Sequence, residues 1–243
     1  MKQLIVNADD FGFTRDVNEG IVAAHRNGIL TATTIMATGP AFAHAVELSR
    51  ENPDLDIGCH LVLVGAPGFP ATIPALLYAV AARRIPIYDE LAAQVRRIVD
   101  AGLRPTHLDT HKHTHILPPV LDAVARISGE FNIPWVRRPL LALSKHRFRT
   151  TDHFAGFRMT GKYDADELAD LIRRLPTGLT EFMCHPGYCT PELRAAPTRL
   201  KESRRRELDA LISPQVRAAI TESTVELVTY RALVGQVSNL QAD

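Results

Sequence analysis

The chain has 243 residues, of which 46% are hydrophobic and 23% charged, and its formal net charge is +1. These are ordinary globular values, and such a small net charge excludes a global basic field that would recruit nucleic acid. Three cysteines without regular spacing argue against a disulfide framework and favour a reducing compartment. No apolar run approaches the roughly 18 residues of a membrane span, and the first residues lack a signal-peptide pattern. We therefore expect a cytoplasmic protein with no membrane span and no nucleic-acid partner.

Short apolar runs alternate with helical patterns along the chain. Strands are predicted at 3–8, 33–36, 57–61, 106–109, 134–136, 180–184 and 225–228. Helices are predicted at 17–25, 41–50, 74–83, 88–101, 120–127, 164–175 and 201–212. The last of these helices is rich in Arg and Glu, which is typical of a solvated face with helical ion pairs.

Three segments depart from this alternation. Residues 64–74 contain three prolines and two glycines, and a connection of this length often forms a lid or a substrate wall. Residues 139–162 show no clear period, so they are compatible with either a loop or an exposed helix. Residues 235–243 are expected to form a frayed tail.

Strands that alternate with helices predict a parallel sheet with helices outside it. Periodicity does not distinguish an open sheet from a closed barrel, but the positions of the polar residues favour a barrel. Carboxylates and imidazoles follow the ends of several different strands: Asp9, Asp10, His60, Asp109, His111 and His185. In barrels of this class, the carboxyl ends of the strands form the rim where active sites are assembled.

The stretch 107–115 reads H-L-D-T-H-K-H-T-H, with His or Asp at every second position. Pro105, Pro118 and Pro119 flank it, which disfavours a helix. An extended conformation places all five of these side chains on one face. A solvated or pH-sensitive histidine run is the plainer alternative. A face of neutral imidazoles and a carboxylate is nevertheless well suited to a divalent metal.

One carboxylate and two imidazoles, with positions left open, fit a catalytic site for zinc or a similar ion. Such a metal polarises a carbonyl and lowers the pKa of bound water, while a second carboxylate accepts a proton. A site with a metal and a second carboxylate is suited to the hydrolysis of an amide or ester. Singly, the two aspartates could form a solvated turn and His60 could be a core histidine, so their joint occurrence carries the prediction. Glycine-rich nucleotide motifs and the Gly-x-Ser-x-Gly elbow are absent from the sequence.

Four motifs resemble those of the YdjC-like carbohydrate deacetylase family: N-A-D-D-F-G at 7–12, G-C-H-L at 58–61, the histidine stretch at 107–115, and C-H-P-G-Y at 184–188. The similarity runs to about Tyr230 and implies a single domain over 1–243. It also implies an irregular (β/α) barrel of the TIM-like kind, related to polysaccharide deacetylases. The implied activity is hydrolysis of N-acetyl groups on amino sugars with one divalent metal, magnesium or zinc, and a homodimer is also expected.

Carried over by motif, the resemblance makes Asp10, His60 and His111 the metal ligands. It makes Asp9 the general base and His185 a proton donor or a clamp on the tetrahedral intermediate. Which aspartate takes which role rests on the resemblance, because spacing alone does not decide it.

Three more residues receive supporting roles: Asp109, His113 and His115. Asp109 is expected to hold His111 in one tautomer, and the two histidines are expected to line the pocket. The segment after His60 is shorter than in chitooligosaccharide-acting members, so a glycolipid head group is an alternative substrate. Another metal-dependent hydrolase, acting on phosphoesters or cyclic amides, and a non-catalytic sugar- or metal-binding protein are the rival functions.

Overall fold

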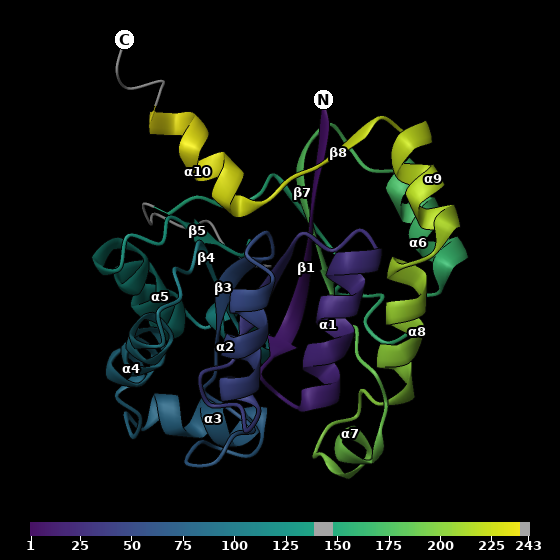
Figure 1. Ribbon diagram of the computed structural model, residues 1–243. Coiled ribbons are helices and arrows are strands. Elements are labelled where there is room, and N and C mark those ends of the chain that lie inside the picture. The colour runs from purple at the N-terminus through teal and green to yellow at the C-terminus, as the bar shows by residue number, and fades with distance from the viewer. Residues whose placement is uncertain (139–147, 239–243) are drawn as a thin grey trace.

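A computed structural model of the protein describes residues 1–138 and 148–238 (Figure 1). Its centre is a sheet of eight strands in which the paired strands are parallel. The strands are β1 (Lys2–Phe11), β2 (Ala32–Ile35), β3 (Asp56–Leu61), β4 (His107–Thr110), β5 (Trp135–Val136), β6 (His153–Ala155), β7 (Gly178–Cys184) and β8 (Val225–Leu227). Parallel pairing brings their carboxyl ends to one edge of the sheet.

The sheet curls into an irregular barrel, which confirms the expected fold class. The strand order is β5-β4-β3-β2-β1-β7-β6, and β8 pairs with the first residues of β1. Residues 149–155 span the remaining gap, because Arg149 forms a bridge with Trp135 of β5 while residues 153–155 pair with β7. The irregularity therefore lies at β5 and β6, which have only two and three residues.

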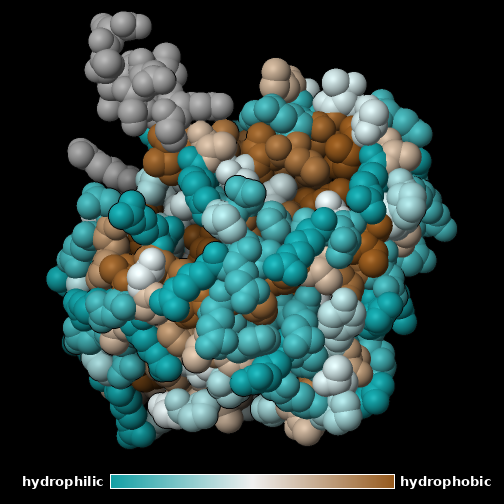
Figure 2. Space-filling view, viewed as in Figure 1, coloured by the Kyte–Doolittle hydropathy of each residue, from teal (hydrophilic) through white to brown (hydrophobic). Residues whose placement is uncertain are grey.

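Helices surround the sheet. They are α1 (Arg15–Asn27), α2 (Phe42–Glu51), α3 (Ile73–Ala81), α4 (Ile87–Asp100), α5 (Pro118–Glu130), α6 (Ala165–Arg173), α7 (Pro191–Ala195), α8 (Glu202–Leu211), α9 (Pro214–Glu222) and α10 (Tyr230–Ser238), with a 3₁₀ helix at His111–Ile116. Their outward faces are mainly hydrophilic in the view of Figure 2, as amphipathic helices packed on a sheet require.

Helix α10 lies at the end of the barrel where β1 begins, opposite the carboxyl ends of the strands (Figure 1). Tyr230 stacks on the ring of His107, with centroids 4.1 Å apart, and packs in a small apolar cluster with Ile5 and Trp135. This end of the barrel is therefore filled by side chains.

Helix α1 packs closely against the chain that follows β7. Thr14 caps its first turn by accepting a hydrogen bond from the backbone of Val17. A Cβ atom at Gly20 would lie only 2.4 Å from the backbone of Gly187, so a glycine is needed at this contact. The contact places the segment that follows His185 against the helix.

The predicted elements are present, with several differences. The extended conformation expected for 107–115 is wrong beyond Thr110, since Lys112 and His113 adopt left-handed φ values of 54° and 53° in the 3₁₀ helix. β6, α7, α9 and α10 were not predicted from the sequence. Helix α10 continues to Ser238, into the segment expected to be frayed, and 139–147 and 239–243 lie outside the described residues.

In the part of the chain that the structure describes, no helix has the length and apolar character needed to cross a bilayer.

Candidate functional site

A cavity of about 1180 Å³ lies at the carboxyl edge of the sheet. Five of the six residues expected at the barrel rim line it, namely Asp9, Asp10, His60, His111 and His185, whereas Asp109 is not part of the lining. His113, which was expected to line the pocket, does so as well. Val64, Pro67 and Phe69, from the segment 64–74, form part of its wall.

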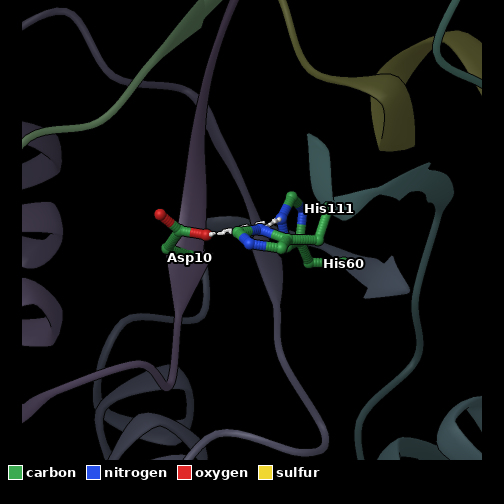
Figure 3. Close-up of side chains that lie close together, drawn as sticks. All are labelled: Asp10, His60 and His111. Carbon is green, nitrogen blue, oxygen red and sulfur yellow. Dashed lines mark hydrogen bonds and ion pairs between the residues drawn. The ribbon is translucent and has the colours of Figure 1, made fainter. Parts of the chain in front are cut away.

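Asp10, His60 and His111 converge at one point, although they come from β1, β3 and the turn after β4 (Figure 3). Oδ1 of Asp10 lies 3.4 Å from Nε2 of His60 and 3.4 Å from Nδ1 of His111, and these two nitrogens are 3.2 Å apart. Oδ1 is buried and has no hydrogen-bond partner among the described residues. Three donor atoms directed at one point, one of them an unpartnered carboxylate oxygen, form a set that could hold a divalent cation.

The backbone of Asp10 explains how two adjacent aspartates reach the same cavity. Successive side chains of a regular strand point to opposite faces. Asp10 instead has a left-handed φ of 70°, and the β1–β2 register shifts between Ala8 and Phe11. Both carboxylates therefore line the cavity, which the sequence could not establish.

Asp9 is held by Arg137, a residue that the sequence analysis did not identify. Nη1 of Arg137 donates to Oδ2 of Asp9 at 2.8 Å, and Nη2 donates to Oδ1 at 2.6 Å. Burial alone would raise the pKa of Asp9, but the guanidinium holds it well below its usual value. Asp9 is consequently an ionised carboxylate with a fixed orientation.

The same guanidinium contacts two more buried carboxylates. Nε of Arg137 donates to Glu181 at 2.8 Å, and Nη2 lies 2.8 Å from Oδ2 of Asp109. Asp9, His60 and Asp109 form a second group compatible with a metal by distance alone. In this second group, Arg137 already places a positive charge between Asp9 and Asp109.

Asp109 supports His60 rather than His111, so that part of the prediction is wrong. Oδ1 of Asp109 lies 2.7 Å from Nδ1 of His60, which leaves Nε2 of the imidazole directed at Asp10. Thr34 donates to Oδ2 of Asp109 at 3.0 Å and helps to fix the carboxylate. The register explains the pairing, since Asp109 lies directly opposite His60 in the β3–β4 ladder.

The carboxylates around His60 stabilise the protonated form of its imidazole. Burial lowers the pKa of its imidazole, but the carboxylates of Asp109, Asp10 and Asp9 outweigh burial and raise it to about 10. A bound cation would take over the role of that proton.

His185 lies beside Asp9, with its Nε2 at 3.9 Å from Oδ2 of the carboxylate. Its backbone N–H donates to Glu207 of α8 at 2.6 Å, which anchors the loop that carries it. Burial lowers the pKa of the imidazole below its usual value, and the nearby carboxylates of Asp9 and Glu207 compensate only in part. His185 is therefore neutral at pH 7.

The two remaining histidines of the stretch separate. His113 lines the cavity and makes an edge contact with Phe157, with ring centroids 5.0 Å apart. His115 is fully buried, pairs with Oγ1 of Thr110 at 2.6 Å, and is not part of the cavity lining. The expectation that His115 lines the pocket is wrong, because the left-handed turn at 112–113 directs it into the interior.

Arg204 is a second site residue that the sequence analysis missed. Helix 201–212 was expected to present a solvated face, yet Arg204 is 1% exposed and donates from Nη2 to Oδ2 of Asp10 at 2.5 Å. Arg137 could have been anticipated, since it directly follows β5 and so shares the strand-end position of the other site residues. No comparable pattern in the sequence distinguishes Arg204 from the neighbouring arginines.

Residues 3–222 match the family model described as YdjC-like protein. This chain belongs to the YdjC-like family. A carbohydrate deacetylase of Geobacillus stearothermophilus is 38% identical over 240 residues, which cover 93% of this chain and 96% of the relative. A chitooligosaccharide deacetylase of Klebsiella pneumoniae is 35% identical over 262 residues, covering 94% and 98%.

Two solved structures place this YdjC-like chain among known folds. A protein from Enterococcus faecalis superposes with a TM-score of 0.81 at 28% identity, covering 96% of this chain and 98% of the other. A family 4 carbohydrate esterase from Streptomyces lividans, in complex with acetate, superposes with a TM-score of 0.55 at 11% identity, covering 94% and 92%. The second likeness concerns the fold alone.

Proposed function

We propose that this protein is a metal-dependent deacetylase that hydrolyses the N-acetyl amide of an amino sugar to acetate and a free amine. The observation that carries the proposal is the convergence of Asp10, His60 and His111 beside the separately held carboxylate of Asp9, inside a cavity. The relatives named carbohydrate deacetylase and chitooligosaccharide deacetylase supply the substrate class.

Asp10, His60 and His111 would hold one divalent ion, magnesium or zinc. The bound ion polarises the amide carbonyl and lowers the pKa of water. The residues fit such an ion, because Oδ1 of Asp10 is buried without a hydrogen-bond partner among the described residues and faces two imidazole nitrogens. Asp109 keeps His60 oriented through its other ring nitrogen.

Asp9 is the general base in this proposal and accepts a proton from the attacking water. Arg137 occupies the carboxylate with charged hydrogen bonds, so Asp9 stays ionised and keeps one orientation toward the cavity. It is less suited than Asp10 to bind the metal, because the guanidinium engages both of its oxygens. This division gives the two adjacent aspartates different roles.

His185 faces the substrate from the side of Asp9. Because its imidazole is neutral at pH 7, it acts as an N–H donor to the oxygen or nitrogen of the amide that is cleaved. Nδ1 of His185 is buried without a hydrogen-bond partner among the described residues, and Nε2 lies 3.9 Å from Oδ2 of Asp9. His113, on another wall of the cavity, would contact the sugar.

The proposal includes two properties carried over from the family resemblance: an amino-sugar substrate that is either a chitooligosaccharide or a glycolipid head group, and a homodimer. It also includes the cytoplasmic location expected from the sequence. Light scattering during size-exclusion chromatography tests the dimer. Fractionation of the source cells tests the location.

The deciding experiment is an acetate-release screen over N-acetylated mono- and oligosaccharides and N-acetylated glycolipids. Each substrate is tested with chelator-treated protein, alone and after addition of magnesium or zinc. We expect acetate release that depends on the metal, with close to one ion bound per chain. Phosphate release, or opening of a cyclic amide without acetate, would support the rival hydrolase, and sugar binding without turnover would support the non-catalytic protein.

A further inference from the structure

Arg204 is a buried cation that contacts a residue distant in the sequence. It lies on α8, 194 residues from Asp10, and is 1% exposed. Its neighbour Arg205 is 53% exposed at the side chain and pairs with Asp209 in the ordinary i,i+4 manner. Burying a guanidinium is costly unless it is well paired, so the Arg204–Asp10 contact requires an explanation beyond surface charge.

The contact divides the two oxygens of the Asp10 carboxylate. Nη2 of Arg204 engages Oδ2 at 2.5 Å, while Oδ1 faces the ring nitrogens of His60 and His111 at 3.4 Å. A carboxylate that rotated about its Cβ–Cγ bond would exchange these oxygens or turn both away from the imidazoles. The charged hydrogen bond removes that freedom.

Arg204 is itself held from both sides. Its Nε donates to the backbone oxygen of Leu200 at 3.3 Å, and its own backbone oxygen accepts a hydrogen bond from Gly187 at 3.1 Å. One turn later on α8, Glu207 accepts the backbone N–H of His185. One helix face thus contacts both Asp10 and the loop that carries His185.

We infer that Arg204 is a positioning residue that orients Asp10 so that Oδ1 alone is presented to the metal. This inference rests on the proposed metal site. It predicts an effect opposite to that of simple electrostatics. A positive charge beside a ligand repels a cation, so removal of Arg204 would tighten metal binding if charge alone mattered. If orientation dominates, removal weakens binding, as loss of outer-sphere partners of metal ligands typically does by about 10–100-fold.

The test measures metal affinity rather than activity. Chelator-treated wild type, Arg204→Met, Arg204→Lys and the surface control Arg205→Met are titrated with zinc in a calorimeter. We expect dissociation constants about 10–100-fold higher for both Arg204 variants and no change for Arg205→Met. Lysine keeps the charge but lacks the Nε–H group that anchors the Arg204 side chain to the backbone oxygen of Leu200, so charge alone predicts that Arg204→Lys behaves as wild type.

A second measurement separates positioning from a general role in folding. In an Asp10→Asn background, adding Arg204→Met should change zinc affinity far less than it does in the wild type, because the carboxylate to be oriented is gone. Equal losses in both backgrounds would indicate a structural role and overturn the inference. If Arg204→Met does not fold, Arg204→Lys alone decides between the two explanations.

Zinc affinity within twofold of wild type in a folded Arg204 variant, or tighter binding, would also overturn it. If wild-type protein binds no zinc or magnesium at all, the proposed metal site fails instead. The two failures are therefore distinguishable.

Discussion

Arg137 donates to both oxygens of Asp9, while Asp10, the next residue, directs a free oxygen at two imidazoles. One peptide bond separates a carboxylate whose two oxygens both accept from a guanidinium from one with a single oxygen engaged in this way. The left-handed backbone at Asp10 makes this division possible, because it lets adjacent side chains share one cavity. The predictions below test the division and the packing that supports it.

Asp9→Asn should lose most turnover and keep the metal. The amide cannot accept the proton of the attacking water, and general acid–base groups contribute about 10²–10⁴-fold to the rate. Metal content by atomic absorption and kcat by acetate release provide the measurement. Asp10→Asn is the matched control and should bind the metal more weakly, so its metal content should fall. If Asp9→Asn loses the metal while Asp10→Asn retains it, the two roles are interchanged.

His111→Ala should lower metal occupancy and activity together, because it removes one of three converging ligands. His113→Gln serves as the comparison, since His113 lines the same cavity without pointing into the ligand set. It should raise KM with little change in metal content. Calorimetric metal titration and steady-state kinetics on both variants are needed. Equal metal loss in the two variants would contradict the ligand assignment.

Arg137→Met should destabilise the fold by about 3–5 kcal/mol, because it leaves buried carboxylates without their cation. Urea unfolding measures this loss. The neighbouring exposed Arg138, which among the described residues donates to backbone oxygens of Thr151 and Asp152, provides the control as Arg138→Met. That change should cost far less.

In Arg137→Met, the contribution of Asp9 to stability should change with pH in the opposite direction to that in the wild type. In the wild type, the pKa of Asp9 is lower in the folded protein than in the unfolded chain. Its contribution to stability is therefore fully present above the unfolded pKa and is lost as the pH falls through the folded pKa. Without Arg137, burial raises the pKa of Asp9 above the unfolded value. The folded variant then takes up protons more readily than the unfolded chain, and it gains stability as the pH is lowered from 7 toward 5. Urea midpoints that fall in parallel for both proteins over this range would refute the prediction.

Gly20→Ala should reduce both stability and turnover. The added methyl group would lie 2.4 Å from the backbone of Gly187, so the loop that follows His185 must move. Overpacking of this kind costs about 1–3 kcal/mol or more. Gly129→Ala, in α5 with no atom within 4 Å of the new Cβ, should instead stabilise by about 0.5–1 kcal/mol. Thermal unfolding and kcat of the two alanine variants test the comparison, and unchanged kcat in Gly20→Ala would contradict the coupling.

The alternation of strands and helices, the barrel and the edge at which the site lies all follow from the sequence. Each of these depends on local patterns: the spacing of apolar residues, the glycines and prolines between them, and polar residues directly after strands. Parallel strands collect those ends at one rim, so Asp9, Asp10, His60, His111 and His185 could be placed together without coordinates.

Only the tertiary structure shows which contacts, and therefore which roles, distinguish these site residues from one another. Arg137 is 128 residues from Asp9, and Arg204 is 194 residues from Asp10. Asp109 turned out to support His60, and a left-handed turn removed His115 from the cavity. A hydrogen bond between residues far apart in the sequence produces no periodic pattern that could be recognised in the sequence. A left-handed φ at one or two residues changes the direction of the side chains that follow, and the sequence pattern does not show this change either. Such relationships exist only once the backbone has folded.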